Sequence, residues 1–227
     1  MGNVYDKLGQ YKEALEQHEK CLAIEVKVHG HEHQYVASSY NNIANVYDKQ
    51  GKYEMALELY EKCLAIDIKG MGENHPDVAA TYNNIAIVYN KQGKHEMALE
   101  LYEKCLAIEI KALGEDHPHV AASYGNIGGV YSNQGKHEMA LELYEKSLAI
   151  KIKALGEDHP SVASSYKNIA SVFQSQGRYK EALELLRDGL DINVKVHGVE
   201  HPSVTTSYSN MVKIFKSQGR FEVNPKP

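Results

Sequence analysis

The sequence predicts an all-α protein in which pairs of helices stack into an α-solenoid. Three observations support this fold class. The segment Tyr82 to Pro118 recurs along the 227-residue chain with few changes, and the glycine at its centre recurs every 42 residues, as from Gly51 to Gly93. Apolar residues on both sides of that glycine follow helical spacing. Such a fixed period is typical of stacked repeats, in which each unit buries its apolar face against its neighbours.

Each repeat is expected to contain a shorter first helix and a longer second helix. In the first helix, Tyr82, Ile85, Ala86 and Tyr89 share one face. In the second helix, an equivalent stripe contains Ala98, Leu101, Tyr102, Cys105 and Ile108. Gly93 separates the two helices, because a left-handed glycine ends a helix and lets the chain turn. The Gly-Glu-Asp-His-Pro sequence at 114–118 then closes the second helix and starts the next repeat.

The same pattern places the remaining elements in chain order. We expect one continuous array over residues 1–227, with an incomplete first repeat at 1–29, complete repeats at about 34–70, 76–112, 118–154 and 160–196, a terminal helix at 202–218 and a tail at 219–227. Gly125, Gly128 and Gly129 weaken the first helix of one repeat, which makes that helix a candidate flexible joint. For Gly128 alone we favour the alternative that it permits close packing, as Ala86 does.

The pattern resembles a known family. The spacing from Tyr82 to Tyr102 resembles the tetratricopeptide repeat, although the period is 42 residues instead of about 34. NNIA in the first helix, QGKYEMAL at the turn and LGEDHP at the junction resemble the repeats of kinesin light chains and nephrocystin-type proteins. The resemblance covers nearly the whole chain. It implies a right-handed superhelix whose first helices line a concave surface that binds proteins or peptides.

Composition excludes several function classes. The formal net charge of −5 argues against nucleic-acid binding by bulk electrostatics, and no apolar run approaches the length of a membrane span. No phosphate-binding loop, HExxH motif or nucleophile motif is present, so we expect neither an enzyme nor a cofactor. Cys21, Cys63 and Cys105 follow the repeat and are expected to be buried and unpaired. Unpaired cysteines favour a cytoplasmic location.

Histidine recurs at each junction between repeats, at His33, His75, His117, His159 and His201. Equivalent residues of neighbouring repeats lie too far apart to share one metal ion, so we interpret these histidines as residues of the loop-to-helix junction. The one local cluster, His29, His31 and His33, would at most bind a divalent metal weakly. We therefore assign no metal site.

The candidate ligand-binding residues lie on the face of the first helices opposite the apolar stripe. One position is asparagine in every complete first helix, and an amide both donates and accepts hydrogen bonds. In kinesin-light-chain-like repeats such asparagines hold the backbone of an extended peptide, as the resemblance implies. The alternative is that they hydrogen-bond between helices and hold the array together. The candidates are Asn41, Asn42, Asn83, Asn84, Asn126, Asn168 and Asn210.

Lysines accompany these asparagines on the same face. Lys49, Lys91 and Lys167 share it with Lys213 and Lys216, whereas Asp48 is the only acid that we place there. A basic strip on an acidic protein suggests that the peptide ligand is acidic.

The function that we expect is a non-catalytic protein–protein interaction module of the cargo-adaptor or scaffold type. Two alternatives stay open: an architectural array that self-associates through its uncapped ends, and the sensor region of a larger signalling ATPase. The heptad coiled coil that would join a kinesin light chain to its motor is missing from this sequence.

Overall fold

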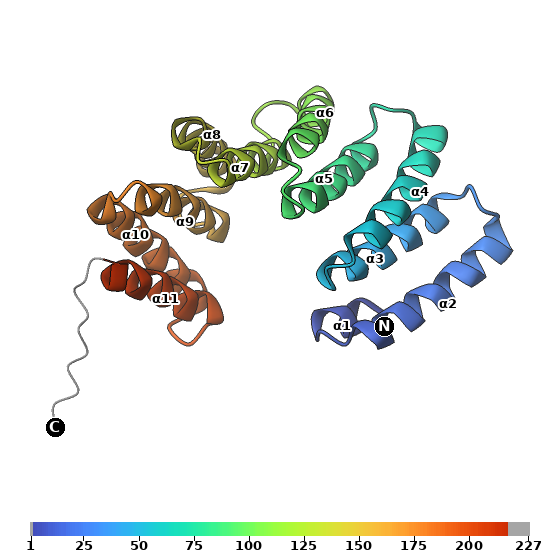
Figure 1. Cartoon of the computed structure of the whole chain (residues 1–227), viewed down its shortest axis with the longest axis horizontal. Coiled ribbons are helices and arrows are strands. Elements are labelled where there is room, and N and C mark those ends of the chain that lie inside the picture. The colour runs from blue at the N-terminus through green and yellow to red at the C-terminus, as the bar shows by residue number, and fades with distance from the viewer. Residues whose placement is uncertain (1, 218–227) are drawn as a thin grey trace. The chain divides into compact units, whose positions relative to one another are not determined.

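The computed structural model describes residues 2–217, and over that range all regular structure is helical (Figure 1). The helices are α1 (Gly2–Lys7), α2 (Tyr11–His29), α3 (Gln34–Lys49), α4 (Tyr53–Met71), α5 (Pro76–Lys91), α6 (His95–Leu113), α7 (Pro118–Asn133), α8 (His137–Leu155), α9 (Pro160–Ser175), α10 (Tyr179–His197) and α11 (Pro202–Ser217). Residue 218 of the predicted last helix and the predicted tail 219–227 lie outside the described residues.

Successive helices form antiparallel pairs, and each of the four complete pairs is made of a 16-residue first helix and a 19-residue second helix. Each of the four complete pairs begins at the residue where its repeat was expected to begin and ends one residue beyond the expected end. The residues form two compact units, which we call the N-terminal unit (up to Gly114) and the C-terminal unit (from Glu115). The single continuous array stays a prediction.

Glycine ends both helices of each repeat, as the sequence predicts. Gly93 has φ 74° and follows α5, and the N–H of Lys94 donates to the carbonyl of Tyr89 at 2.9 Å. Gly114 has φ 88° and follows α6. These left-handed conformations favour glycine, because a Cβ atom would clash with the backbone there.

The recurrent histidines act as helix N-caps. Nδ1 of His75 accepts a hydrogen bond from the backbone N–H of Asp77 at 3.2 Å, and His159 accepts from Ser161 at 3.1 Å. His33, His117 and His201 make the same contact. The side chain satisfies one of the N–H groups that a helix start leaves unpaired. The interpretation as junction residues is therefore confirmed.

The core consists of small and apolar residues contributed by both helices of each pair. In the N-terminal unit, Ala44, Ala56, Leu57, Tyr60, Ile85 and Val88 form one buried cluster of α3, α4 and α5. The first helix of each complete pair also buries two valines at less than 1% exposure, such as Val78 and Val88 in α5. Both valines lie outside the stripe named from the sequence, so the buried face is broader than expected.

The cysteines match the prediction in part. Cys63 and Cys105 are buried, but Cys21 is exposed. At the equivalent position in later repeats the side chain packs on the preceding first helix: Ser147 Oγ donates to the carbonyl of Ala121 at 2.6 Å. The six-residue α1 does not extend to that contact, which explains why the prediction was wrong for Cys21.

The glycine-rich α7 runs unbroken from Pro118 to Asn133, and its role as a flexible joint stays a prediction.

Within residues 2–217, none of the helices combines the length and the apolar character needed to cross a membrane.

Candidate peptide-binding cavities

Three of the predicted asparagines line one cavity in the N-terminal unit. Its walls are the successive first helices α3 and α5, and its floor is the second helix α4. We call this cavity of about 290 Å³ the acidic cavity; its lining includes Asn41, Asn42, Asn84, Thr81, Asp67 and Asp77. None of the described residues that line it is a lysine, arginine or histidine. The asparagines are half-buried, so their amides lie at the edge of solvent.

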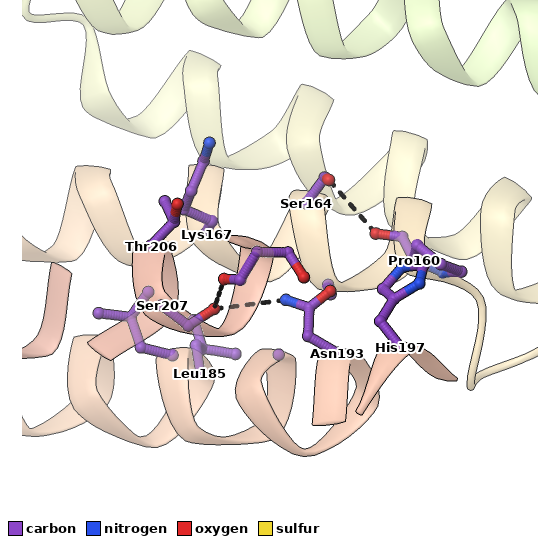
Figure 2. Close-up of a pocket in the computed structure, with 12 residues that line it drawn as sticks. Pro160, Ser164, Lys167, Leu185, Asn193, His197, Thr206 and Ser207 are labelled. Carbon is purple, nitrogen blue, oxygen red and sulfur yellow. Dashed lines mark hydrogen bonds between the residues drawn. The ribbon is translucent and has the colours of Figure 1, made fainter. Parts of the chain in front are cut away.

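Two cavities in the C-terminal unit contain the other members of the predicted set. The amide cavity, of about 280 Å³, lies between α9, α10 and α11 and is lined by Lys167, Asn193, Ser203, Thr206 and Ser207 among others (Figure 2). The lysine cavity, of about 350 Å³, lies beside it and is lined by Lys167, Lys213, Asn168, Asn210 and Gln174 among others. No aspartate or glutamate is among the described residues that line either one.

The acidic cavity and the amide cavity are the same feature of the fold, three repeats apart. Asp67 corresponds to Asn193, Asp77 to Ser203 and Thr81 to Ser207. Asn41 corresponds to Lys167. The backbone therefore creates the same hollow twice, and the side chains give it opposite electrostatic character.

One position on the second helices controls much of this difference, and we call it the variable position. It is occupied in turn by Glu25, Asp67, Glu109, Lys151 and Asn193. In four repeats its side chain bonds to a Ser or Thr of the next first helix, fourteen residues later: Ser39 Oγ donates to Glu25 at 2.6 Å, Thr81 Oγ1 donates to Asp67 at 3.4 Å, Lys151 Nζ donates to Ser165 at 2.9 Å, and Asn193 Nδ2 donates to Ser207 at 3.3 Å.

Burial changes the titration of the charged residues at this position. Desolvation raises the pKa of the Asp67 carboxyl, although hydrogen bonds from Cys63 and Thr81 oppose that shift. Desolvation lowers the pKa of the Lys151 ammonium. In both cases the interior disfavours the charged form, as expected when a charge leaves water.

The two predicted lysines of the N-terminal unit are already ion-paired. Lys49 Nζ lies 2.5 Å from Asp6, and Lys91 Nζ lies 2.6 Å from Asp48. The aspartate side chains are only 13% exposed. The face of the first helices that carries Lys49 and Lys91 therefore also carries two acids, and Asp6 was overlooked in the sequence. The pairs reduce the net charge that Lys49 and Lys91 present to a ligand.

The predicted asparagines differ in their surroundings. Asn84 Nδ2 donates to Asn41 Oδ1 at 3.0 Å, which joins two successive first helices. Asn83 and Asn126 are half-buried and already interact within the chain. Asn168 and Asn210 come together with Lys167 in the lysine cavity. Peptide binding by any of these residues stays a prediction.

The variable position was not among the candidates predicted from the sequence, because all of those candidates lie on the first helices. Asp67 is 2% and Glu109 is 8% exposed. A signal was present: among nearly identical repeats, this position lies one helical turn after the small residue Cys63 or Cys105, and it is an acid in the first three repeats, a lysine in the fourth and an asparagine in the fifth.

Comparisons with known proteins agree on the fold. The family model of the tetratricopeptide repeat matches residues 1–69, 77–153 and 120–195. No match was found among the curated proteins. A Podosopora anserina structure, described as a candidate kinesin light chain with nearly identical TPR-like repeats, is 33% identical, with a TM-score of 0.69, and the match covers 86% of this chain and 93% of that one.

Two more distant structures share the fold alone. BtubC (BKLC) from P. vanneervenii is 20% identical, with a TM-score of 0.77, over 93% of this chain and 85% of that one. MamA is 19% identical, with a TM-score of 0.55, over 86% and 95% of the two chains. The repeated helix pairs, the match of the family model over most of the chain and the similarity to the Podosopora protein together show that this chain belongs to the tetratricopeptide repeat family.

Proposed function

We propose that this chain is a non-catalytic peptide-binding array of the adaptor or scaffold type, and that its C-terminal unit holds an acidic segment of a partner protein. The observation that carries the proposal is the lysine cavity, in which Lys167 and Lys213 meet Asn168 and Asn210 without an acid in the described lining. The amides supply donors and acceptors for a peptide backbone, and the ammonium groups attract carboxylates.

Two observations favour this unit for the acidic ligand. Lys167 and Lys213 are exposed and are not among the ion-paired residues of the described chain, whereas Lys49 and Lys91 are. The adjacent amide cavity extends the polar lining through the shared Lys167. Tetratricopeptide repeats typically bind protein partners, and this family membership supports the general role.

An array of peptides of equal length, ranging from strongly acidic to strongly basic, tests the proposal. We expect the wild-type chain to prefer acidic peptides, with an affinity that falls as salt rises. The double variant Lys167→Gln/Lys213→Gln should bind them at least about tenfold more weakly.

The matched control is Lys104→Gln/Lys146→Gln. It removes the same charge from exposed lysines that pair with glutamates on second helices. Equal losses in both double variants would show that only net charge matters, and the proposed site would then be wrong.

A further inference from the structure

The acidic cavity of the N-terminal unit does not suit the acidic ligand that we propose for the C-terminal unit. Two carboxylates, Asp67 on α4 and Asp77 on α5, face a hollow whose other polar groups are mostly amides and hydroxyls. Asp77 is exposed at the rim and Asp67 is 2% exposed at the floor. The lining therefore repels a carboxylate and favours a cation.

The buried carboxylate of Asp67 is incompletely satisfied. Its Oδ2 accepts hydrogen bonds from Cys63 Sγ at 3.3 Å and from Thr81 Oγ1 at 3.4 Å. Its Oδ1 has no hydrogen-bond partner among the described residues, although the atom is buried. Leaving a buried carboxylate oxygen unpaired is costly, and a donor that enters the cavity would remove that cost.

The Cys63 thiol does not carry a negative charge that could pair with a cation in place of Asp67. Burial raises the pKa of the Cys63 thiol to about 12, so at neutral pH it is a neutral S–H group that donates to Asp67. The carboxylate is thus oriented by two neutral donors on Oδ2, and the neutral Gln34 side chain of the cavity lining also favours its charged form, so that none of the three partners supplies a positive charge.

We propose that the acidic cavity binds the guanidinium group of an arginine side chain from a partner polypeptide. A guanidinium carries five donors in a planar fork and matches a site with several separate oxygen acceptors. A metal ion is disfavoured, because no group of three or more His, Cys, Asp or Glu residues among residues 2–217 is arranged to hold one. The proposed function concerns residues of the other unit, so either proposal can fail without the other.

The chain contains its own comparison for this site. In the amide cavity the equivalent residues are Asn193, Ser203 and Ser207, with Lys167 in place of Asn41. The hollow is similar in size there but has no carboxylate in its described lining. Arginine recognition should therefore be confined to the N-terminal unit and should depend on Asp67.

The test uses the full chain and small probes of defined chemistry. Acetyl-Gly-Arg-Gly-amide is titrated into the ¹⁵N-labelled protein, with the citrulline peptide as the neutral isostere and the lysine peptide as a second cation. We expect saturable chemical-shift changes at Ser38 and Thr81, and binding of the arginine peptide at least about tenfold tighter than that of the citrulline peptide.

Two variants connect the effect to the cavity. Asp67→Asn introduces the residue that already occupies the same place at position 193, so the fold is expected to tolerate it, and it should abolish the preference for arginine over citrulline. Asn193→Asp combined with Lys167→Asn should create that preference in the C-terminal unit. Glu103→Gln removes an exposed acid of α6 and serves as the charge-matched control with no expected effect.

Each possible result either supports or overturns the proposal. Selective loss in Asp67→Asn, with wild-type behaviour in Glu103→Gln, supports the proposal. Equal binding of the arginine and citrulline peptides by the wild-type chain overturns it, as does a preference that survives Asp67→Asn. A tighter complex with the lysine peptide than with the arginine peptide overturns the assignment to guanidinium.

Discussion

Lys151 donates a hydrogen bond to Ser165 across two successive helices, with Nζ and Oγ 2.9 Å apart. Asp67 occupies the equivalent place two repeats earlier and accepts from Thr81 instead. A hydroxyl both donates and accepts, so one Ser or Thr can serve a carboxylate, an ammonium or an amide. The variable position can therefore change charge from repeat to repeat without loss of this interhelical hydrogen bond.

The first prediction concerns the free-energy cost of burying the Lys151 side chain at the variable position. Desolvation lowers its pKa, so the folded state disfavours the charged form, and this penalty applies at pH values below the folded pKa. Lys151→Gln keeps a donor for Ser165 without the charge. It should raise the free energy of unfolding at neutral pH by up to about 1 kcal/mol, with a smaller gain at strongly alkaline pH.

Chemical denaturation across that pH range measures the effect. Lys153→Gln is the control, because Lys153 is exposed and forms a surface ion pair with Asp116, which should change stability by less than about 1 kcal/mol. A loss of stability in Lys151→Gln at neutral pH would contradict the prediction.

The second prediction applies the same reasoning to Asp67, with the opposite charge. Because burial raises the pKa of this carboxyl, the folded state favours its protonated form. The penalty is absent below the ordinary pKa of 3.8, appears as pH rises above it, and is complete above the folded value. Asp67→Asn should therefore be more stable than wild type at pH 7, and the difference should disappear in acid.

Denaturation at pH 7 and near pH 3.5, with Glu103→Gln alongside, checks this expectation. If Asp67→Asn were less stable than wild type at pH 7, the carboxylate would be a net stabilising group. Stability alone would then explain the buried acid at this position, and its burial would no longer indicate a ligand.

The outcome for the fold shows what a strict repeat can predict. The complete repeats begin and end within one residue of the expected bounds because each repeat carries the same signals, such as Gly114 at its end and His117-Pro118 at the next start. The ion pair between Lys91 and Asp48 was not predicted, because it joins residues 43 apart on different helices. Such a contact depends on how helices pack rather than on spacing within one helix.

The candidate site was predictable only in part for a similar reason. Asn84 and Asn168 were found because asparagine recurs without change. Asp67 was missed because neighbouring positions on one helix can lie on a buried face or on a solvent-exposed face. The sequence pattern does not show to which of these faces a single acid belongs, whereas packing leaves Asp67 only 2% exposed.

The third prediction uses the glycines of α7, which differ in their surroundings. A Cβ atom on Gly129 would have Tyr144 Oη as its nearest neighbour at an ordinary 3.6 Å, whereas one on Gly128 would lie 3.0 Å from the Tyr144 ring. Gly129→Ala should stabilise the protein by about 0.5–1 kcal/mol, because alanine favours the helix and meets no obstacle. Gly128→Ala should gain less, because the ring must shift.

Thermal unfolding of the two variants decides this prediction. Equal gains would show that the ring of Tyr144 moves without cost. A loss in Gly129→Ala would mean that the helix needs the conformational freedom of glycine there, which would favour the flexible-joint hypothesis.

The fourth prediction separates the two roles considered for the asparagines. Asn84 is bonded to Asn41 of the preceding first helix, so Asn84→Ala should cost about 0.5–1.5 kcal/mol of stability. Asn168 is the equivalent residue two repeats later, but Gly125 stands where Asn41 would be and offers no side chain. Asn168→Ala should therefore cost less stability.

Peptide binding should respond in the reverse order, because Asn168 lines the lysine cavity and Asn84 lines the acidic cavity. Binding of acidic peptides should weaken in Asn168→Ala and remain in Asn84→Ala. Circular dichroism melts and fluorescence anisotropy on the same two variants measure both quantities. If Asn168→Ala lost stability as Asn84→Ala does and kept full peptide affinity, the asparagines would hold the helices together in every repeat, and the lysines alone would have to account for any binding.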